Sequence, residues 1–177
     1  MWMHLLEWLE NSALAMWVAA SDSLWGYPTI LMLHTFGMGL LVGASAVVDL
    51  RLLGVGRDVP LAVLRKVSRP VWIGFTVNAT TGALLFVGAA TLKGTQKLFA
   101  LKLTFILIAL LVDRRIRRAV LGAPGALAGS PTRQPRWGAL AAHDAPIPTG
   151  ARFLAATSLL FWAAAITAGR LMAYIEW

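Results

Sequence analysis

Four long apolar stretches dominate the sequence, and their length suggests helices that cross a membrane. They run over about residues 28–48, 71–90, 98–112 and 153–172. About twenty apolar residues are needed to cross a bilayer as one helix. The third stretch is shorter than that, and Lys102 interrupts it. The pattern predicts an all-α integral membrane protein in which the four spans form an antiparallel four-helix bundle.

Residues 1–26 have a different pattern, because their apolar positions fall on one side of a helical wheel instead of forming a continuous run. This pattern predicts an amphipathic helix that precedes the bundle and lies in the membrane interface. Tryptophans suit the head-group region and serve as anchors there. The apolar side holds Leu5, Leu6, Leu9, Ala13, Met16 and Trp17, and the polar side holds His4, Glu7, Glu10, Asn11 and Ser12.

The composition agrees with a membrane protein and excludes several kinds of site. Hydrophobic residues make up 58% of the 177, and the mean hydropathy is +0.70. A chain of this length suits a single membrane domain over residues 1–177. The sequence has no cysteine, so disulfides, thiolate metal sites and thiol nucleophiles are excluded.

The chain carries a net charge of +8, and the positions of its basic residues along the sequence are more informative than the total. The basic residues concentrate in the loop after the first span and around residues 113–118, at the start of a predicted cytoplasmic loop over 119–150. Basic loops stay in the cytoplasm and contact anionic lipid head groups, so nucleic acid is not an expected partner. The distribution predicts a multi-pass protein of the bacterial inner membrane with both termini in the periplasm.

Small residues within the first two spans suggest where helices approach closely. Gly39 and Gly43 are four apart in the first span, and Gly74, Asn78 and Gly82 follow the same spacing in the second. Small side chains allow close contact between helix backbones in a membrane. We therefore expect these positions to pack between the spans.

Ionisable groups inside apolar spans are costly and indicate candidate functional sites. His34, Lys102 and Arg170 each lie near the predicted outer end of a different span, so three basic groups converge on the outer half of the bundle. Asp49 and Asp113 lie at the inner end, where we expect them to pair with neighbouring arginines. The outer site therefore suits a ligand that brings its own negative charge.

Haem b is one such ligand, with His34 as the axial ligand and Lys102 and Arg170 at the propionates. Gly37, one turn after His34, would leave room for the macrocycle. A second axial ligand would come from a histidine on the interfacial helix or from a methionine, or the iron would be five-coordinate. The candidate cofactor-binding residues are His34, Lys102, Arg170, His4, Met38 and Asn78, with His34 as the metal ligand.

A purely structural interpretation of the same residues stays open. A lone histidine in a span can hydrogen-bond Asn78, Thr80, Thr81 or a backbone carbonyl across the bundle. Lys102 and Arg170 lie close enough to the outer surface to reach the head groups.

Residues 31–54, LMLHTFGMGLLVGASAVVDLRLLG, resemble the first span of a family of small uncharacterised four-helix bacterial inner-membrane proteins. The shared features are a histidine early in the span, here His34, and an acidic residue followed by Arg-Leu-Leu-Gly, here Asp49 and Arg51–Gly54. The sequence is more loosely similar to copper-resistance-D-like and b-type cytochrome membrane bundles, which also place histidine on apolar spans. It departs from them in lacking a second histidine within a span.

Three functions follow as expectations. The first is a membrane redox module that binds haem b near the periplasmic face and passes electrons to quinone or a partner subunit. The second is a non-catalytic structural or assembly subunit of a larger membrane complex, or a homo-oligomer. The third is a small anion transporter or channel. Phosphate loops and the common hydrolase motifs are absent from the sequence, so an electron-transfer or accessory subunit is favoured over a stand-alone enzyme.

Overall fold

A computed structural model describes residues 1–59, 64–118, 147 and 149–174. Within these residues every element is a helix, in agreement with the predicted all-α class. The elements are α1 (Trp2–Glu10), α2 (Ala13–Ala20), α3 (Tyr27–Leu53), the short 3₁₀ helix η1 (Arg65–Val67), α5 (Ser68–Val87), α6 (Ala90–Thr95), α7 (Lys97–Ile116) and α8 (Thr149–Leu171).

Three of the long helices, α3, α5 and α8, are long and apolar enough to cross a membrane. They correspond to the first, second and fourth predicted spans. The third predicted span lies within α7, which has 20 residues, as α5 does. It is more polar, because Lys102 lies within it and Asp113, Arg114 and Arg115 lie in its last turn. The predicted loop over 119–150 lies outside the described residues except at its end, where α8 already begins at Thr149.

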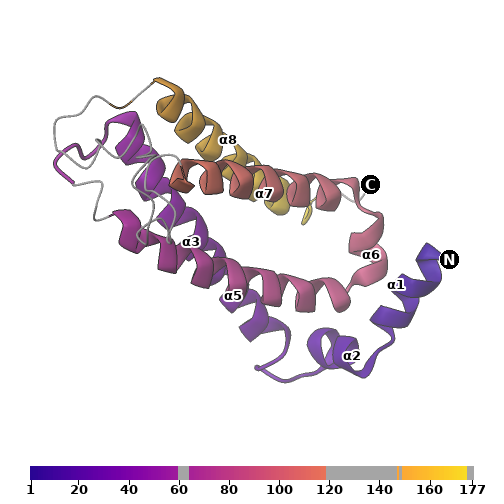
Figure 1. Ribbon diagram of the computed structural model, residues 1–177. Coiled ribbons are helices and arrows are strands. Elements are labelled where there is room, and N and C mark those ends of the chain that lie inside the picture. The colour runs from indigo at the N-terminus through magenta and orange to yellow at the C-terminus, as the bar shows by residue number, and fades with distance from the viewer. Residues whose placement is uncertain (60–63, 119–146, 148, 175–177) are drawn as a thin grey trace, which may run out of the picture.

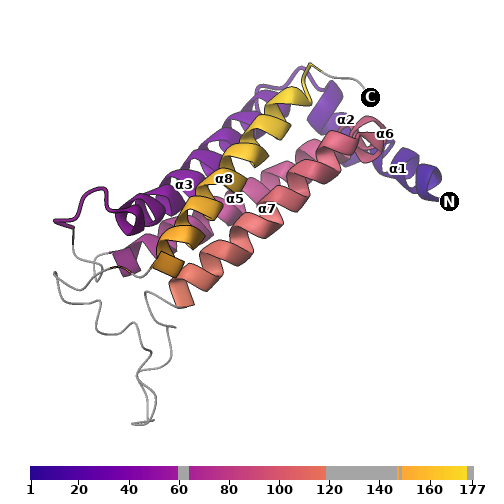
Figure 2. The ribbon, with the colours of Figure 1, turned by 90° about the horizontal axis from the view of Figure 1, so that it is seen from above.

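The four long helices pack mainly as two pairs, and the most extensive packing between the pairs is that of α3 on α8 (Figures 1 and 2). α3 packs along α5, α7 packs along α8, and α3 joins the pairs by packing on α8. α3 and α7 end where α5 and α8 begin, and we call this the inner end. A buried cluster from both pairs closes it. This inner apolar cluster consists of Val48, Leu52, Leu64, Ile116, Ala151 and Ala155.

Two glycines determine how closely α3 and α5 approach. A Cβ atom on Gly74 would lie 2.6 Å from the backbone nitrogen of Leu41, and one on Gly37 would lie 2.9 Å from the backbone nitrogen of Asn78. The backbones therefore touch, as small residues allow. The expectation for Gly39 and Gly43 was wrong, because a Cβ at either position would meet no atom within 4 Å.

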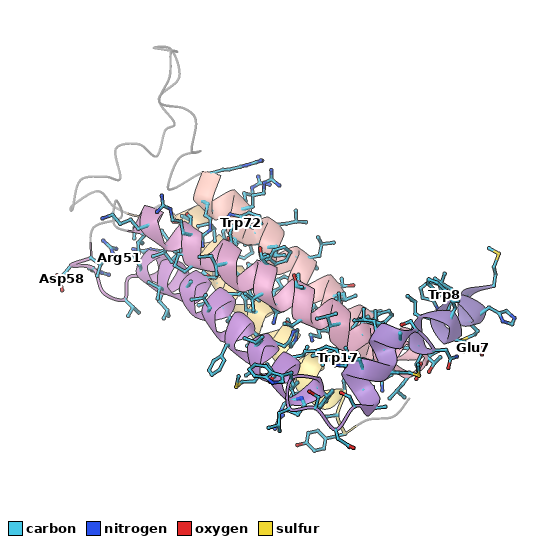
Figure 3. All side chains as sticks on the ribbon, turned by 90° about the horizontal axis from the view of Figure 1, so that it is seen from below. Glu7, Trp8, Trp17, Arg51, Asp58 and Trp72 are labelled. Atoms are coloured by element: carbon cyan, nitrogen blue, oxygen red, sulfur yellow. The ribbon has the colours of Figure 1, made fainter. Side chains whose placement is uncertain are left out.

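Gly54 and the side chain of Arg51 stabilise the C-terminal end of α3 and the turn that follows it. Gly54 has φ of 106°, the left-handed conformation that glycine adopts without strain, and its N–H bonds to the carbonyl of Arg51. The Arg51 side chain donates to the carbonyl oxygens of Val59 and Arg57, each at 2.8 Å. The arginine thus fastens the turn after α3, which lies at the opposite end of the molecule from α1 (Figure 3).

The N-terminal segment consists of two helices, so the prediction of a single helix over residues 1–26 was wrong. The break falls at Asn11, and Ser12 caps α2 by accepting a hydrogen bond from the N–H of Ala15. α1 packs on α6, where the fully buried Leu6 fills the space beside Gly94. Trp8 on α1 is exposed, in keeping with an interfacial anchor (Figure 3).

The start of α5 is not capped by a side chain. Ser68 is the first residue of the helix, and its N-cap is Val67. The Ser68 hydroxyl instead accepts a hydrogen bond from Arg117 of α7 at 3.0 Å. The serine therefore links α5 to α7 at the inner end.

The glycine contact yields a direct test. Gly74→Ala places a methyl group against the α3 backbone, so we expect it to destabilise the fold by about 1–3 kcal/mol, the usual cost of overpacking. The control Gly39→Ala adds the same methyl group in open space inside a helix, so it should stabilise the fold by up to about 1 kcal/mol. Thermal unfolding in detergent micelles, followed by circular dichroism, measures both. Equal melting temperatures for the two variants would contradict this packing.

Candidate functional site

His34 lies in the seam between α3 and α5, that is, at the interface where the two helices touch. Side chains of each helix form hydrogen bonds with the backbone of the other there. The Nδ1 atom of His34 is 3.1 Å from the carbonyl oxygen of Asn78 and 3.1 Å from the hydroxyl of Thr81. In return, the Asn78 side-chain amide donates to the carbonyl oxygen of His34 at 2.9 Å. The predicted hydrogen bonding of His34 to Asn78 and Thr81 is therefore confirmed.

These contacts assign the two ring nitrogens of His34 different roles. A carbonyl oxygen only accepts hydrogen bonds, so Nδ1 carries the hydrogen in the neutral ring and Nε2 keeps a lone pair. Gly82 packs against the ring, since a Cβ there would lie 3.1 Å from Cε1. A histidine held through Nδ1 by a carbonyl is the usual arrangement of a metal-binding imidazole. The α3–α5 seam thus orients a half-buried ring whose Nε2 is available for a ligand.

Two half-buried lysines lie within electrostatic range of this ring. The side chain of Lys102 on α7 lies over Gly169 of α8, where an added Cβ would be 3.3 Å from its Cε. Lys93 comes from α6, and burial lowers the pKa of its amine below the usual range. His34, Lys93 and Lys102 form what we call the outer basic cluster. Lys93 was not among the residues predicted for the site.

The other predicted site residues make no hydrogen bond or ion pair with this cluster in the described part of the chain. Arg170 on α8 is exposed, and so is His4 on α1, whose Nδ1 is 3.6 Å from the carboxylate of Glu7. Met38 is half-buried on α3, and no polar contact involves it in the described part of the chain. Of the six predicted cofactor-binding residues, the structure therefore brings together His34, Asn78 and Lys102.

The expectation that Gly37 makes room for a macrocycle was wrong. The space beside it is filled by the backbone of α5 at Asn78. Among the described residues, no group of three or more His, Asp or Glu side chains is placed to hold a metal ion. The cluster therefore offers one oriented ligand nitrogen and two cations for a cofactor.

Nearer the inner end, a second group of polar residues is more deeply buried than any residue of the outer cluster. Ser45 and Asp49 of α3 and Ser158 of α8 have no exposed surface, and Trp162 of α8 is 3% exposed. We call these four residues the inner polar layer. Their side-chain oxygens and the indole nitrogen have no hydrogen-bond partner among the described residues.

The inner carboxylates differ from each other, and only one behaves as expected. Asp113 pairs with Arg117, whose Nε and Nη2 donate to its two oxygens at 2.7 and 3.0 Å. Asp49 has no such partner, so the expectation of an arginine pair was wrong there. Arg51, the arginine nearest in sequence, is used by the turn after α3.

Sequence reasoning missed the inner polar layer because its residues appeared to have other roles. The fourth span is rich in small residues, so Ser158 resembled a packing residue, and Asp49 was expected to pair with a neighbouring arginine. The spacing could have revealed the layer, since Ser45 and Asp49, like Ser158 and Trp162, are four apart and share a helix face. That face of α3 also carries the buried Leu41 and Leu52.

Comparisons with protein-family models, with curated proteins and with solved structures found no match. The resemblance of residues 31–54 to small four-helix membrane proteins therefore stays a hypothesis. The structure does give each matched position a role: His34 joins α3 to α5, Asp49 lies in the inner polar layer, Arg51 fastens the following turn, and Gly54 ends the helix.

The helix that carries Lys93 is also held by a carboxylate from α1. Glu10 accepts hydrogen bonds from the backbone N–H of Thr91, at 2.7 Å, and from the Thr91 hydroxyl. These bonds favour the ionised form, so they lower the pKa of Glu10. Together with Leu6 beside Gly94, they dock α1 onto α6.

Docking of α1 should therefore depend on pH. A carboxylate whose folded pKa is lowered stabilises the docked state above its ordinary pKa, and that stabilisation is lost as the pH falls through the lowered value. We expect the protection factors of the α1 amides, which are corrected for the intrinsic pH dependence of exchange, to fall on acidification in the wild type. In Glu10→Gln the protection factors should be low at every pH, whereas the exposed-site control Glu7→Gln should match the wild type. Protection factors in α1 that are independent of both pH and Glu10 would contradict the contact.

Proposed function

We propose that this chain is an integral membrane protein of the bacterial inner membrane, built as an antiparallel bundle of α3, α5, α7 and α8. Three of these helices are suited to a membrane by length and composition, and α7 packs against α8 along its length. Arg-rich segments at the inner end favour placing that end in the cytoplasm and both termini in the periplasm. The charges of α7 do not prevent this, because Lys102 lies against α8 and Asp113 is paired.

Within this bundle we propose that the outer basic cluster holds haem b and that the protein is a membrane redox module. The orientation of His34 carries the proposal, since Nδ1 is bound by the Asn78 carbonyl and Nε2 has a lone pair to offer. Lys93 and Lys102 supply positive charge for the propionates. When bound, haem supplies a one-electron carrier. The protein's part is to orient the imidazole and to compensate the anionic groups.

An absorption spectrum tests this function. Protein purified after expression with added haem should show a Soret band, and the band should be absent in His34→Ala. Since His34 also joins α3 to α5, external imidazole supplied to His34→Ala should restore the band if the variant is folded. A colourless wild-type protein, or a Soret band unchanged in His34→Ala, would refute haem binding at this residue.

A small anion is the second candidate ligand, and the two lysines favour it. Lys93 and Lys102 are half-buried, and neither forms an ion pair within the described residues. Buried cations without a carboxylate partner favour an anion from solution.

Anion flux in liposomes separates this candidate from haem binding. We expect Lys102→Gln to reduce the flux about tenfold, the effect of losing about 1.4 kcal/mol of anion stabilisation. The matched control Lys97→Gln removes an exposed lysine from the same helix and should leave the flux unchanged. Equal flux in the wild type and both variants would exclude this role.

A further inference from the structure

Asp49 is enclosed by apolar residues along the bundle axis in both directions. Toward the inner end lies the inner apolar cluster, in which Val48 and Leu52 flank Asp49 on α3. Toward the outer half lies a second cluster, formed by Leu41, Val71 and Ala109 with Trp162, whose indole nitrogen is its one polar atom and is counted in the inner polar layer. The carboxyl group therefore lies in a polar layer between two apolar layers and has no exposed surface.

The polar atoms of this layer form an incomplete hydrogen-bond set. Among the described residues, none of the side-chain oxygens of Asp49, Ser45 and Ser158, nor the indole nitrogen of Trp162, has a hydrogen-bond partner at full hydrogen-bond geometry, although the Ser158 hydroxyl lies close enough to act on the Asp49 carboxyl group. The hydroxyls and the indole N–H could donate to an ionised carboxylate, but they carry no charge and would leave its negative charge uncompensated. Burying an unpaired charge costs several kcal/mol, and buried polar groups in proteins are almost always partnered. This set of atoms therefore lacks a positively charged partner or a proton.

The charges around Asp49 lead to the same conclusion. From α7, Asp113 and Arg117 act on Asp49, but they pair with each other. Arg117 also donates to Ser68 of α5, so its hydrogen bonds are made to Asp113 and Ser68. From α8, the one ionisable residue at this end is Arg152, which is exposed. The buried Arg51 donates to backbone carbonyls of the turn after α3. Among the charges that act directly on this site, two carboxylates and one guanidinium leave Asp49 without a counter-charge.

We propose that the inner polar layer is a binding site for one monovalent cation, and that a proton on Asp49 is its occupant. The proton comes from the aqueous phase at the inner end, which α3 reaches one turn after Asp49, about 6 Å along the helix axis. It converts the carboxylate into a carboxylic acid with no other reactant. The new O–H donates to the neighbouring hydroxyl of Ser158, and the excess negative charge is removed. This site is separate from the outer basic cluster and does not depend on any ligand there.

Infrared spectroscopy of the full chain in liposomes detects this proton directly. At neutral pH we expect the carbonyl stretch of one protonated carboxyl group per chain, shifted in D₂O. The band should be absent in Asp49→Asn, in which an amide replaces the acid at nearly the same volume. The matched control Asp58→Asn changes an exposed carboxylate in the turn after α3 and should keep the band (Figure 3).

A second variant tests the charge balance independently. Asp113→Asn removes one negative charge and releases Arg117 from its ion pair, so Asp49 and Arg117 then neutralise each other. We expect the protonated-carboxyl band to disappear although Asp49 is still present. A band that persists unchanged in Asp113→Asn would contradict the charge count behind the proposal.

A sodium ion is the alternative occupant, because it carries the same single positive charge. Melting temperatures measured in NaCl and in KCl at equal ionic strength distinguish it from a proton. The site holds sodium if the wild type lacks the infrared band and has a higher melting temperature in NaCl than in KCl, while Asp49→Asn has the same melting temperature in both salts. If the band is absent and neither salt distinguishes the wild type from Asp49→Asn, the cation site does not exist.

Should Asp49→Asn fail to fold, the variant Ser158→Ala replaces it in the infrared experiment. Removal of the hydroxyl acceptor should shift the band, and an unshifted band would place the protonated acid elsewhere.

Discussion

The close approach of α3 and α5 is the contact on which the rest of the molecule depends. It requires glycine at Gly37 and Gly74, because any side chain at either position would meet the opposite backbone. The same contact brings Asn78 and Thr81 to His34 and so determines the orientation of the imidazole. α3 then packs on α8 with the face that carries Ser45 and Asp49. One helix thus connects the seam, the outer basic cluster and the inner polar layer.

The two polar regions differ in chemical character and lie far apart along this helix. His34 and Asp49 are separated by about 22 Å at 1.5 Å per residue, and Leu41 and Trp162 lie between them in an apolar cluster. The outer basic cluster has no carboxylate among its members, whereas inside the inner polar layer the Asp49 carboxylate has no counter-charge in contact with it, although the surface of the inner end is rich in arginine.

The long helices were predictable from the sequence because their cause is local: each is a continuous apolar run bounded by charged or glycine-rich segments. The prediction of 28–48 for the first span differs from the observed Tyr27–Leu53 mainly at its polar end. The hydrogen bonds of His34 were also predictable, since few polar groups lie within reach in an apolar bundle.

The face that each residue presents to a neighbour was much harder to predict. Gly37 and Gly39 are two positions apart, so they lie on nearly opposite sides of a helix, and only the packed structure shows that Gly37 meets α5. The same uncertainty in rotation hid Asp49, because a carboxylate one turn from a helix end can face solvent or the bundle. The break at Asn11 coincides with the local cap that Ser12 forms for α2, and the docking of α1 onto α6 is a long-range contact that the helical wheel of residues 1–26 does not contain.

The length of α3 has a consequence for the kind of membrane that suits this protein. Its 27 residues extend about 40 Å, whereas the hydrocarbon core of a bilayer is about 30 Å thick. In the proposed orientation the helix must tilt or extend into a head-group layer. Lipids with longer acyl chains would then draw the buried carboxyl deeper, and shorter ones would bring it nearer to the water. Bilayer thickness would in this way govern how readily the charge on α3 exchanges with its surroundings.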